Sequence, residues 1–303
     1  MKAIPQFLSA IKQGDYLSLA RALTLIENDL PGSAGLLQGI EINRQIPVIG
    51  ITGPPGAGKS TLVNSMISKL SLQKKRIAIL AVDPTSPFNL GSLLGDRVRM
   101  SAHFNNPDVY IRSVATRGSV GGLSAKIIEM VDVLRAADFD YIIVETVGVG
   151  QSEIEIAGLA DITLVVLVPE AGDEIQHIKS GLMEIGDAFI VNKADREGAD
   201  TFANRLKKML HQRVQTIPVF KTIAEQQEGV DELLDWLQTT GTGKNEKKIF
   251  LLTEKAYNLI RNSRMRDVSK TDLQHRLAQA SLHEDFNLYR FIQEYATPRI
   301  NPV

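Results

Sequence analysis

Apolar residues between positions 46 and 220 recur in short runs, and most of these runs are followed by a stretch with helical spacing. The runs that predict buried strands are residues 46–52, 76–83, 109–114, 141–146, 161–168, 187–191 and 217–220. The helical patterns between them cover residues 59–72, 123–137, 175–184 and 199–213. This alternation is typical of an α/β fold with a mainly parallel sheet that helices cover on both faces.

Both ends of the chain have helical patterns without strands. Near the N-terminus, Gly14 and the Pro31-Gly32 pair interrupt the helical spacing of the apolar residues. A polar, glycine-containing linker follows Leu237, and residues 249–296 then predict two or three helices. We therefore expect an N-terminal helical extension (1–45), a central α/β domain (46–240) and a C-terminal helical arm (241–303).

The first predicted strand leads into a glycine-rich turn that matches the P-loop pattern G-x-x-x-x-G-K-[ST]. In this pattern backbone N–H groups converge on phosphate oxygens, Lys59 reaches the β- and γ-phosphates, and Ser60 binds Mg²⁺. If the turn bound no ligand, the presence of Lys59-Ser60-Thr61 directly after the glycines would be a coincidence. The expected phosphate-binding residues are Gly53, Pro54, Pro55, Gly56, Ala57, Gly58, Lys59, Ser60 and Thr61.

Two acidic residues stand at the ends of predicted strands, where ligands of a parallel sheet bind. Glu145 occupies the Walker-B position, and its buried carboxylate needs a partner. Asp83 ends the second strand and is a candidate Mg²⁺ ligand, although it can also begin an Asx turn before Pro84. These two roles of Asp83 can coexist.

Three loops after strand ends are candidate switches. The first covers residues 86–100, in which Asp96 is also a candidate N-cap of a helix beginning at Arg97. In the second, residues 146–153, Gln151 either orients a water molecule or lies where a helix begins. In the third, residues 169–179, Asp173 and Gln176 resemble a capping box, and this role is compatible with a switch function.

The sixth predicted strand ends in Asn192-Lys193-Ala194-Asp195, an N-K-x-D pattern. The Asp195 carboxylate can accept hydrogen bonds from both N1–H and the 2-amino group of guanine, whereas N1 of adenine is itself an acceptor. Asn192 is expected to support the loop and the base, and Lys193 to lie over the ring. A further backbone contact to the base is expected from Thr222, Ile223 and Ala224. The sequence thus predicts binding of GTP and GDP.

Composition narrows the function classes further. The 303 residues are 44% hydrophobic, which is enough for one large domain with appended helices. With 34 basic and 35 acidic residues, the net charge of −1 gives no reason to expect nucleic acid or a membrane surface as partner. No apolar run approaches the roughly 20 residues of a membrane-spanning helix, so we expect a cytoplasmic protein.

Taken together, these motifs resemble the MeaB/MMAA-type (ArgK-like) P-loop GTPases, which are chaperones of adenosylcobalamin-dependent methylmalonyl-CoA mutase and its relatives. The most specific matching segments are residues 53–61, 81–84, 95–100, 145–153, 171–174 and 192–195. The resemblance implies a cobalamin-dependent acyl-CoA mutase as partner and a homodimer held by the C-terminal arm.

The resemblance also implies roles for individual residues. Lys59, Asp83, Asp96 and Glu145 would serve phosphate binding, Mg²⁺ binding and hydrolysis. Asp173 and Lys179 would lie in a third switch that faces the mutase.

Two other functions compete with this interpretation. A GTPase that inserts nickel needs soft or imidazole ligands, whereas this chain has no cysteine and five scattered histidines. The second is a nucleotide-dependent interaction module in which hydrolysis is incidental. GTP turnover measured with and without a mutase separates this module from the chaperone.

Overall fold

The computed structural model describes residues 4–83, 100–115, 126–146, 152–169, 182–211, 217–240, 246–265, 268–283 and 286–296. The chain divides into two compact units, residues 1–249 and 250–303. The sequence pattern had set the start of the C-terminal arm at residue 241, inside the first of these units.

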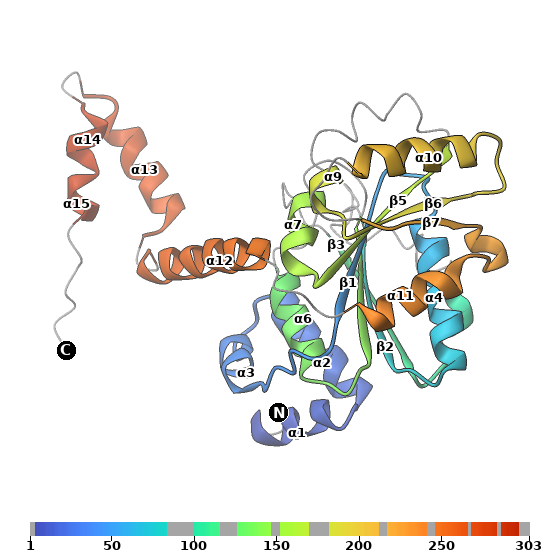
Figure 1. Cartoon of the computed structure of the whole chain (residues 1–303). Helices are drawn as coiled ribbons and strands as arrows, with labels where there is room; N and C mark the ends of the chain where they lie inside the picture. The colour runs from blue at the N-terminus through green and yellow to red at the C-terminus, as the bar shows by residue number, and fades with distance from the viewer. Residues whose placement is uncertain are drawn as a thin grey trace. The chain divides into compact units, whose positions relative to one another are not determined.

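A seven-stranded sheet forms the centre of the first unit (Figure 1). Its strands run in the order β3-β2-β4-β1-β5-β6-β7, and every neighbouring pair is parallel. The strands are β1 (Val48–Thr52), β2 (Ile77–Asp83), β3 (Val109–Ala115), β4 (Tyr141–Glu145), β5 (Ile162–Leu167), β6 (Ala188–Asn192) and β7 (Val219–Thr222). The predicted α/β fold is therefore confirmed. β7 ends two residues later than the sequence pattern predicted, because Thr222 still pairs with Asn192.

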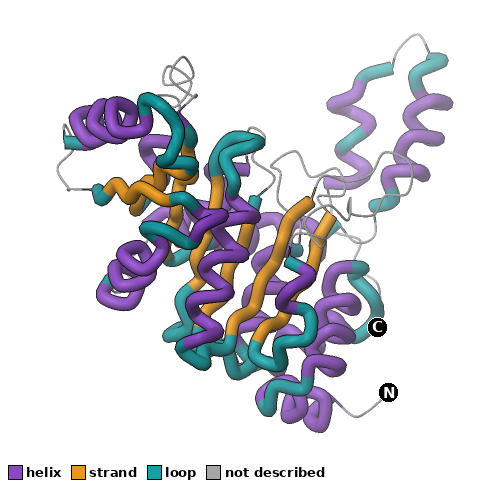
Figure 2. Tube along the Cα trace, turned by 90° about the vertical axis from the view of Figure 1, so that its right-hand side faces the viewer, coloured by secondary structure: helices purple, strands orange, loops and turns teal. Residues whose placement is uncertain are grey.

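Helices cover both faces of this sheet. Figure 1 shows α4 and α11 on one side and α6 and α7 on the other, and Figure 2 shows the strands between helices from a second direction. The described helices of the domain are α4 (Lys59–Leu72), α6 (Ile127–Arg135), α7 (Ser152–Leu159), α9 (Leu182–Ile185), α10 (Ala199–Leu210) and α11 (Val230–Thr239), with the short 3₁₀ helices η1 (Ser101–His103) and η3 (Ala224–Gln226).

Two apolar clusters hold these layers together. Met66 of α4 and Leu233 of α11 belong to the cluster on one face, and Phe189 of β6 and Phe202 of α10 belong to the other. α4 has the bounds that its apolar spacing predicted. The sequence pattern does not assign α11, and the linker that it predicts after Leu237 begins within this helix, which ends at Thr239.

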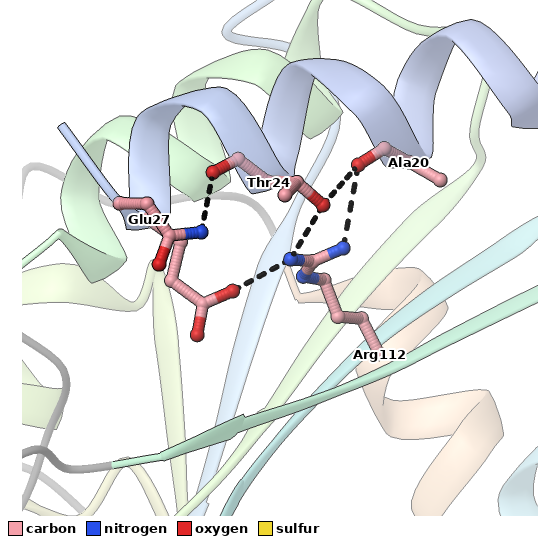
Figure 3. A network of polar contacts seen from close by, with 5 residues as sticks. Ala20, Thr24, Glu27 and Arg112 are labelled. Atoms are coloured by element: carbon pink, nitrogen blue, oxygen red, sulfur yellow. Dashed lines mark hydrogen bonds and ion pairs between the residues drawn. The ribbon is translucent and has the colours of Figure 1, made fainter. Parts of the chain in front are cut away.

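The N-terminal extension forms the three helices α1 (Ile4–Lys12), α2 (Tyr16–Glu27) and α3 (Ser33–Gly39). Figure 3 shows how α2 is tied to the sheet by Arg112 of β3. The Arg112 guanidinium donates to Glu27 Oε2 at 2.6 Å, to Thr24 Oγ1 at 3.1 Å and to the Ala20 carbonyl at 3.4 Å. The Arg112 and Glu27 side chains are only 17% and 10% exposed, so α2 is an integral layer of the first unit.

The described part of the C-terminal region contains α12 (Glu246–Arg264), α13 (Lys270–Ala280), α14 (Leu288–Phe291) and α15 (Gln293–Ala296). The sequence had predicted two or three helices for this region. Arg276 of α13 donates to the Tyr295 hydroxyl at 2.8 Å, which links α13 to α15. Neither α13 nor α14 has a buried residue.

Candidate functional site

The turn between β1 and α4 depends on two glycines of the P-loop pattern. Gly53 and Gly58 have φ values of +139° and +85°, in the region that favours glycine. A Cβ on Gly53 would lie 2.0 Å from the Val166 carbonyl oxygen, and one on Gly58 would lie 2.3 Å from Asn192 Nδ2. Glycine at both positions therefore lets the loop approach β5 and β6 closely.

Lys59 is the first residue of α4 and is 7% exposed. Its ammonium group donates to the carbonyls of Gly53 at 3.0 Å and Pro54 at 3.1 Å, so it lies against the loop that precedes it. The N-terminus of α4 adds the positive end of a helix dipole at the same place. Both features favour an anion at this turn, as the sequence predicts.

Ser60 and Glu145 lie together although they are distant in the sequence. Ser60 Oγ donates to Glu145 Oε1 at 2.7 Å, and both side chains are buried. β4 pairs with β1 so that Glu145 stands opposite Ile51, which places the carboxylate beside the P-loop. A hydroxyl and a carboxylate provide the oxygen ligands that Mg²⁺ prefers, so these two residues fit the expected metal site.

The remaining catalytic and switch candidates are only partly within the described chain. Asp83 is the last residue of β2, opposite Ala115 in β3. It therefore ends at the same edge of the sheet as Glu145, with β4 between β2 and β1. Asp96, Gln151, Asp173 and Lys179 lie outside the described residues.

A pocket of about 130 Å³ lies beside the P-loop. Three segments line it: the start of α4, the N-K-x-D segment and the residues after β7. The lining residues are Gly58, Thr61, Asn192, Lys193, Asp195, Arg196, Ile223, Ala224, Glu225 and Gln226. Asp195 is exposed at this pocket, where its carboxylate is accessible to a ligand.

Asn192 joins these three segments. It is 2% exposed, and its Nδ2 donates to the Ala57 carbonyl at 2.9 Å. Its Oδ1 accepts hydrogen bonds from Thr222 Oγ1 and from the Ala224 N–H, each at 3.1 Å. Asn192 thus links the P-loop to the segment after β7. The Ala224 N–H, which the sequence suggests as a donor to the base, is directed toward Asn192.

Lys193 has a φ of +55°, and its ammonium group donates to the Gly56 carbonyl at 2.9 Å. The side chain therefore extends along the pocket to the P-loop. The Ala194 N–H donates to the Thr222 carbonyl at 3.0 Å, which holds the N-K-x-D segment against the end of β7.

Four residues of this site were not identified from the sequence. Arg196, Glu225 and Gln226 line the pocket, and Ser65 of α4 donates to the Ala224 carbonyl. Ser65 carries a hydroxyl at a position of α4 that lies among buried apolar residues. This polar residue on an apolar face was the feature of the sequence that could have indicated a hydrogen bond. The three pocket residues carried no such signal, because exposed polar residues after a strand are common in loops.

Two kinds of feature are absent from the described residues. No group of three or more histidine, cysteine, aspartate or glutamate side chains there could hold a metal ion. No helix in that part of the chain is long and apolar enough to cross a membrane.

A P-loop on a parallel sheet, an acid at the end of the neighbouring strand and an N-K-x-D pocket define a P-loop GTPase. Comparison with known families agrees, since the model of the methylmalonyl-CoA mutase-associated GTPase MeaB matches residues 19–276. The chain belongs to the MeaB family and is a GTPase that binds guanine nucleotides.

Individual relatives support this assignment. A protein of Pyrococcus horikoshii that is named as a GTPase is 44% identical to this chain over 241 residues. The match covers 77% of this chain and 76% of the relative. GTPase ArgK of Escherichia coli is 37% identical over 198 residues, which cover 63% and 60% of the two chains. A fused isobutyryl-CoA mutase of Geobacillus kaustophilus is 35% identical over 237 residues, which cover 72% of this chain and 22% of that protein.

Among solved structures, the crystal structure of a LAO/AO transport system kinase has the same fold. Its TM-score is 0.69 at 23% sequence identity, and the match covers 97% of this chain and 96% of that one.

Proposed function

We propose that this GTPase is a chaperone that gates cofactor loading and protection of a cobalamin-dependent acyl-CoA mutase. The observation that carries the proposal is the fused isobutyryl-CoA mutase, in which a region similar to 72% of this chain is part of a mutase polypeptide. Fusion of two functions in one relative supports their association as separate chains in another. The printed description of the family, a mutase-associated GTPase, supports the same partner.

In this proposal the candidate site residues have separate roles in binding and hydrolysing GTP. The N–H groups of the P-loop and Lys59 bind the phosphates, while Asp195 accepts hydrogen bonds from the base. Ser60 and Glu145 would hold Mg²⁺, with Asp83 and Asp96 as further candidates. When bound, the ion neutralises negative charge that develops on the phosphate oxygens. EDTA is therefore expected to stop turnover.

Three loops follow strands at one edge of the sheet, after β2, β4 and β5. They cover residues 86–100, 146–153 and 169–179, most of which lie outside the described part of the chain. The strands β4 and β5, which precede the second and third loops, flank β1, and β2 lies next to β4. In our proposal their arrangement depends on the γ-phosphate, and the mutase binds the surface that they form. By linkage, a mutase that prefers the GTP-bound surface strengthens GTP binding by the same factor.

The test is GTP turnover by the full chain, alone and with a purified cobalamin-dependent acyl-CoA mutase from the same organism. We expect the mutase to raise kcat, since partners of known GTPases accelerate hydrolysis by up to roughly 10³- to 10⁵-fold. Lys179→Ala should keep the basal rate and lose much of the stimulation. Lys59→Ala is the control that loses both rates.

Two outcomes would contradict the proposal. Equal loss of basal and stimulated rates in Lys179→Ala would assign this residue to the nucleotide site or to the fold. Nucleotide-dependent binding to the mutase without any change in turnover would indicate an interaction module in which hydrolysis is incidental.

A further inference from the structure

Ser65 lies on α4, just over one helical turn after the P-loop serine, and is 2% exposed. Its hydroxyl donates to the carbonyl oxygen of Ala224, which is 159 positions away in the sequence. The Thr61 carbonyl, one turn earlier in α4, lies 3.1 Å from the same hydroxyl. A serine hydroxyl has one proton and can donate fully to only one of these two carbonyl oxygens, and the bond to Ala224 is the one that links α4 to the segment after β7.

Ala224 is held on both sides of its backbone. Its N–H donates to Asn192 Oδ1 at 3.1 Å, and its carbonyl oxygen also accepts a hydrogen bond from the Gln227 N–H at 3.2 Å. With Ser65 as a third partner, both backbone groups of this buried residue have fixed directions. The residue that follows, Glu225, lines the pocket that contains Asp195.

The Ser65 bond therefore has a consequence for the pocket. The peptide bond between Ala224 and Glu225 is trans, so its C=O and N–H groups point in opposite directions. When Ser65 fixes the direction of the Ala224 carbonyl, it also fixes the direction of the Glu225 N–H. The Ala224 N–H donates to Asn192, so the Glu225 N–H is the next backbone donor along this segment.

We propose that Ser65 is a positioning residue for base recognition, because it orients the Ala224–Glu225 peptide so that the Glu225 N–H donates to O6 of guanine. This inference rests on the assignment of the pocket to a guanine base. An N–H donor suits the carbonyl oxygen at position 6 of guanine, whereas the amino group at position 6 of adenine is a donor and cannot pair with it. Ser65 would then add to the discrimination that Asp195 provides.

The experiment compares two nucleotides by isothermal titration calorimetry on the full chain. GDP has O6 and a proton on N1, whereas the diphosphate of 2-aminopurine riboside keeps the 2-amino group but has hydrogen at position 6 and no proton on N1. The wild type should therefore bind the 2-aminopurine nucleotide more weakly than GDP, and the test compares the effect of the Ser65 substitution on each nucleotide. In Ser65→Ala the affinity for GDP should fall about three- to tenfold, which corresponds to one lost hydrogen bond. The affinity for the 2-aminopurine nucleotide should stay unchanged, because it cannot accept a bond at position 6.

Ser68→Ala is the matched control. Ser68 lies on the same helix, and its hydroxyl donates to the Asn64 carbonyl at 2.9 Å and lies 3.4 Å from His103 Nε2. This variant should bind both nucleotides like the wild type. Alanine is the best helix former, so both variants should fold, and thermal unfolding checks this.

The possible outcomes distinguish a failure of the inference about Ser65 from a failure of the assignment of the pocket to guanine. Equal losses for both nucleotides in Ser65→Ala would show a general structural role, and no loss for GDP would show no role; either result overturns the inference about Ser65. If the wild type itself bound GDP and the 2-aminopurine nucleotide equally well, the assignment of the pocket to guanine would fail instead.

Discussion

Selectivity for guanine is expected to depend on the carboxylate of Asp195. Asp195→Asn should lower GTP affinity at least about tenfold, because the amide places a donor where guanine also has donors. The same variant should admit xanthosine triphosphate, since the amide can donate to the carbonyl at position 2 of xanthine. Competition binding with GTP and xanthosine triphosphate measures both effects.

Asp200→Asn provides the control for this prediction. Asp200 is an exposed carboxylate nearby that pairs with Lys221 at 2.6 Å and does not line the pocket. It should retain the affinity of the wild type for both nucleotides. Unchanged GTP affinity in Asp195→Asn would remove the assignment of this residue to the base.

His103, in η1, carries a pH dependence that can also be tested at the level of one residue. Burial lowers the pKa of this imidazole, and a backbone hydrogen bond involving Asn64 opposes the shift. The unfolded chain then binds a proton at a higher pH than the folded chain does. The stabilising contribution is present above the unfolded pKa near 6.5 and is lost as the pH falls through the lower folded pKa.

We therefore expect the wild type to lose more stability between pH 7.5 and pH 5.5 than His103→Gln does. Urea unfolding at the two pH values gives the free energy of unfolding for each protein, and carboxylates that titrate in this range cancel in the comparison. A pH dependence identical in both proteins would contradict the prediction.

At the scale of elements, the polar network around Arg112 contributes to the position of α2, beside the apolar side chains that this helix buries. Glu27→Ala leaves the Arg112 guanidinium in a mostly buried place without its carboxylate (Figure 3). The expected loss in the free energy of unfolding is about 2–3 kcal/mol, somewhat below the cost of breaking a fully buried pair, because both side chains retain some solvent contact. Urea unfolding measures this loss.

The matched control is Glu41→Ala, which removes another ion pair of the N-terminal helices. Glu41 pairs with Lys12 at 2.9 Å, but the two side chains are 83% and 72% exposed. Exposed pairs contribute little to stability because water screens them, so the control should change the free energy of unfolding only slightly. Similar losses in both variants would show that burial of the Arg112 network has no special effect.

At the scale of the whole molecule, the C-terminal arm is expected to hold a homodimer. Its helix α12 exposes large apolar side chains, among them Phe250 at 69% and Ile260 at 53%. Exposed apolar patches of this kind mark interaction surfaces, and symmetric self-association is the commonest way to cover them. The double variant Phe250→Ser with Ile260→Ser should therefore be monomeric by light scattering.

The control for the dimer is Glu254→Ser with Arg261→Ser, which changes two exposed polar positions on the same helix. This variant should keep the mass of the wild-type dimer. A wild type that is already monomeric, or an apolar double variant that stays dimeric, would contradict the prediction.

Local patterns were sufficient for most of the secondary structure of the first unit. The bounds of α4 were predicted because the P-loop glycines and the apolar spacing lie within one short segment. α11 was missed, although Val230, Leu233, Leu234 and Leu237 are buried and have helical spacing. Its start is set by Gly229, whose φ of +72° brings it against the Lys221 carbonyl. That contact comes from β7, so the local pattern alone did not identify it.

The sequence by itself determined the chemistry of the P-loop and of the N-K-x-D segment, because each motif places its donors and acceptors within a few residues. Only the tertiary structure decided which distant groups meet. Strand order brings Glu145 to Ser60 across 85 positions and Asn192 to Ala57 across 135. The Ser65 bond to Ala224 arises in the same way, since it depends on how α4 packs beside the segment after β7. Such contacts are set by packing of the whole sheet, which no short stretch of sequence specifies.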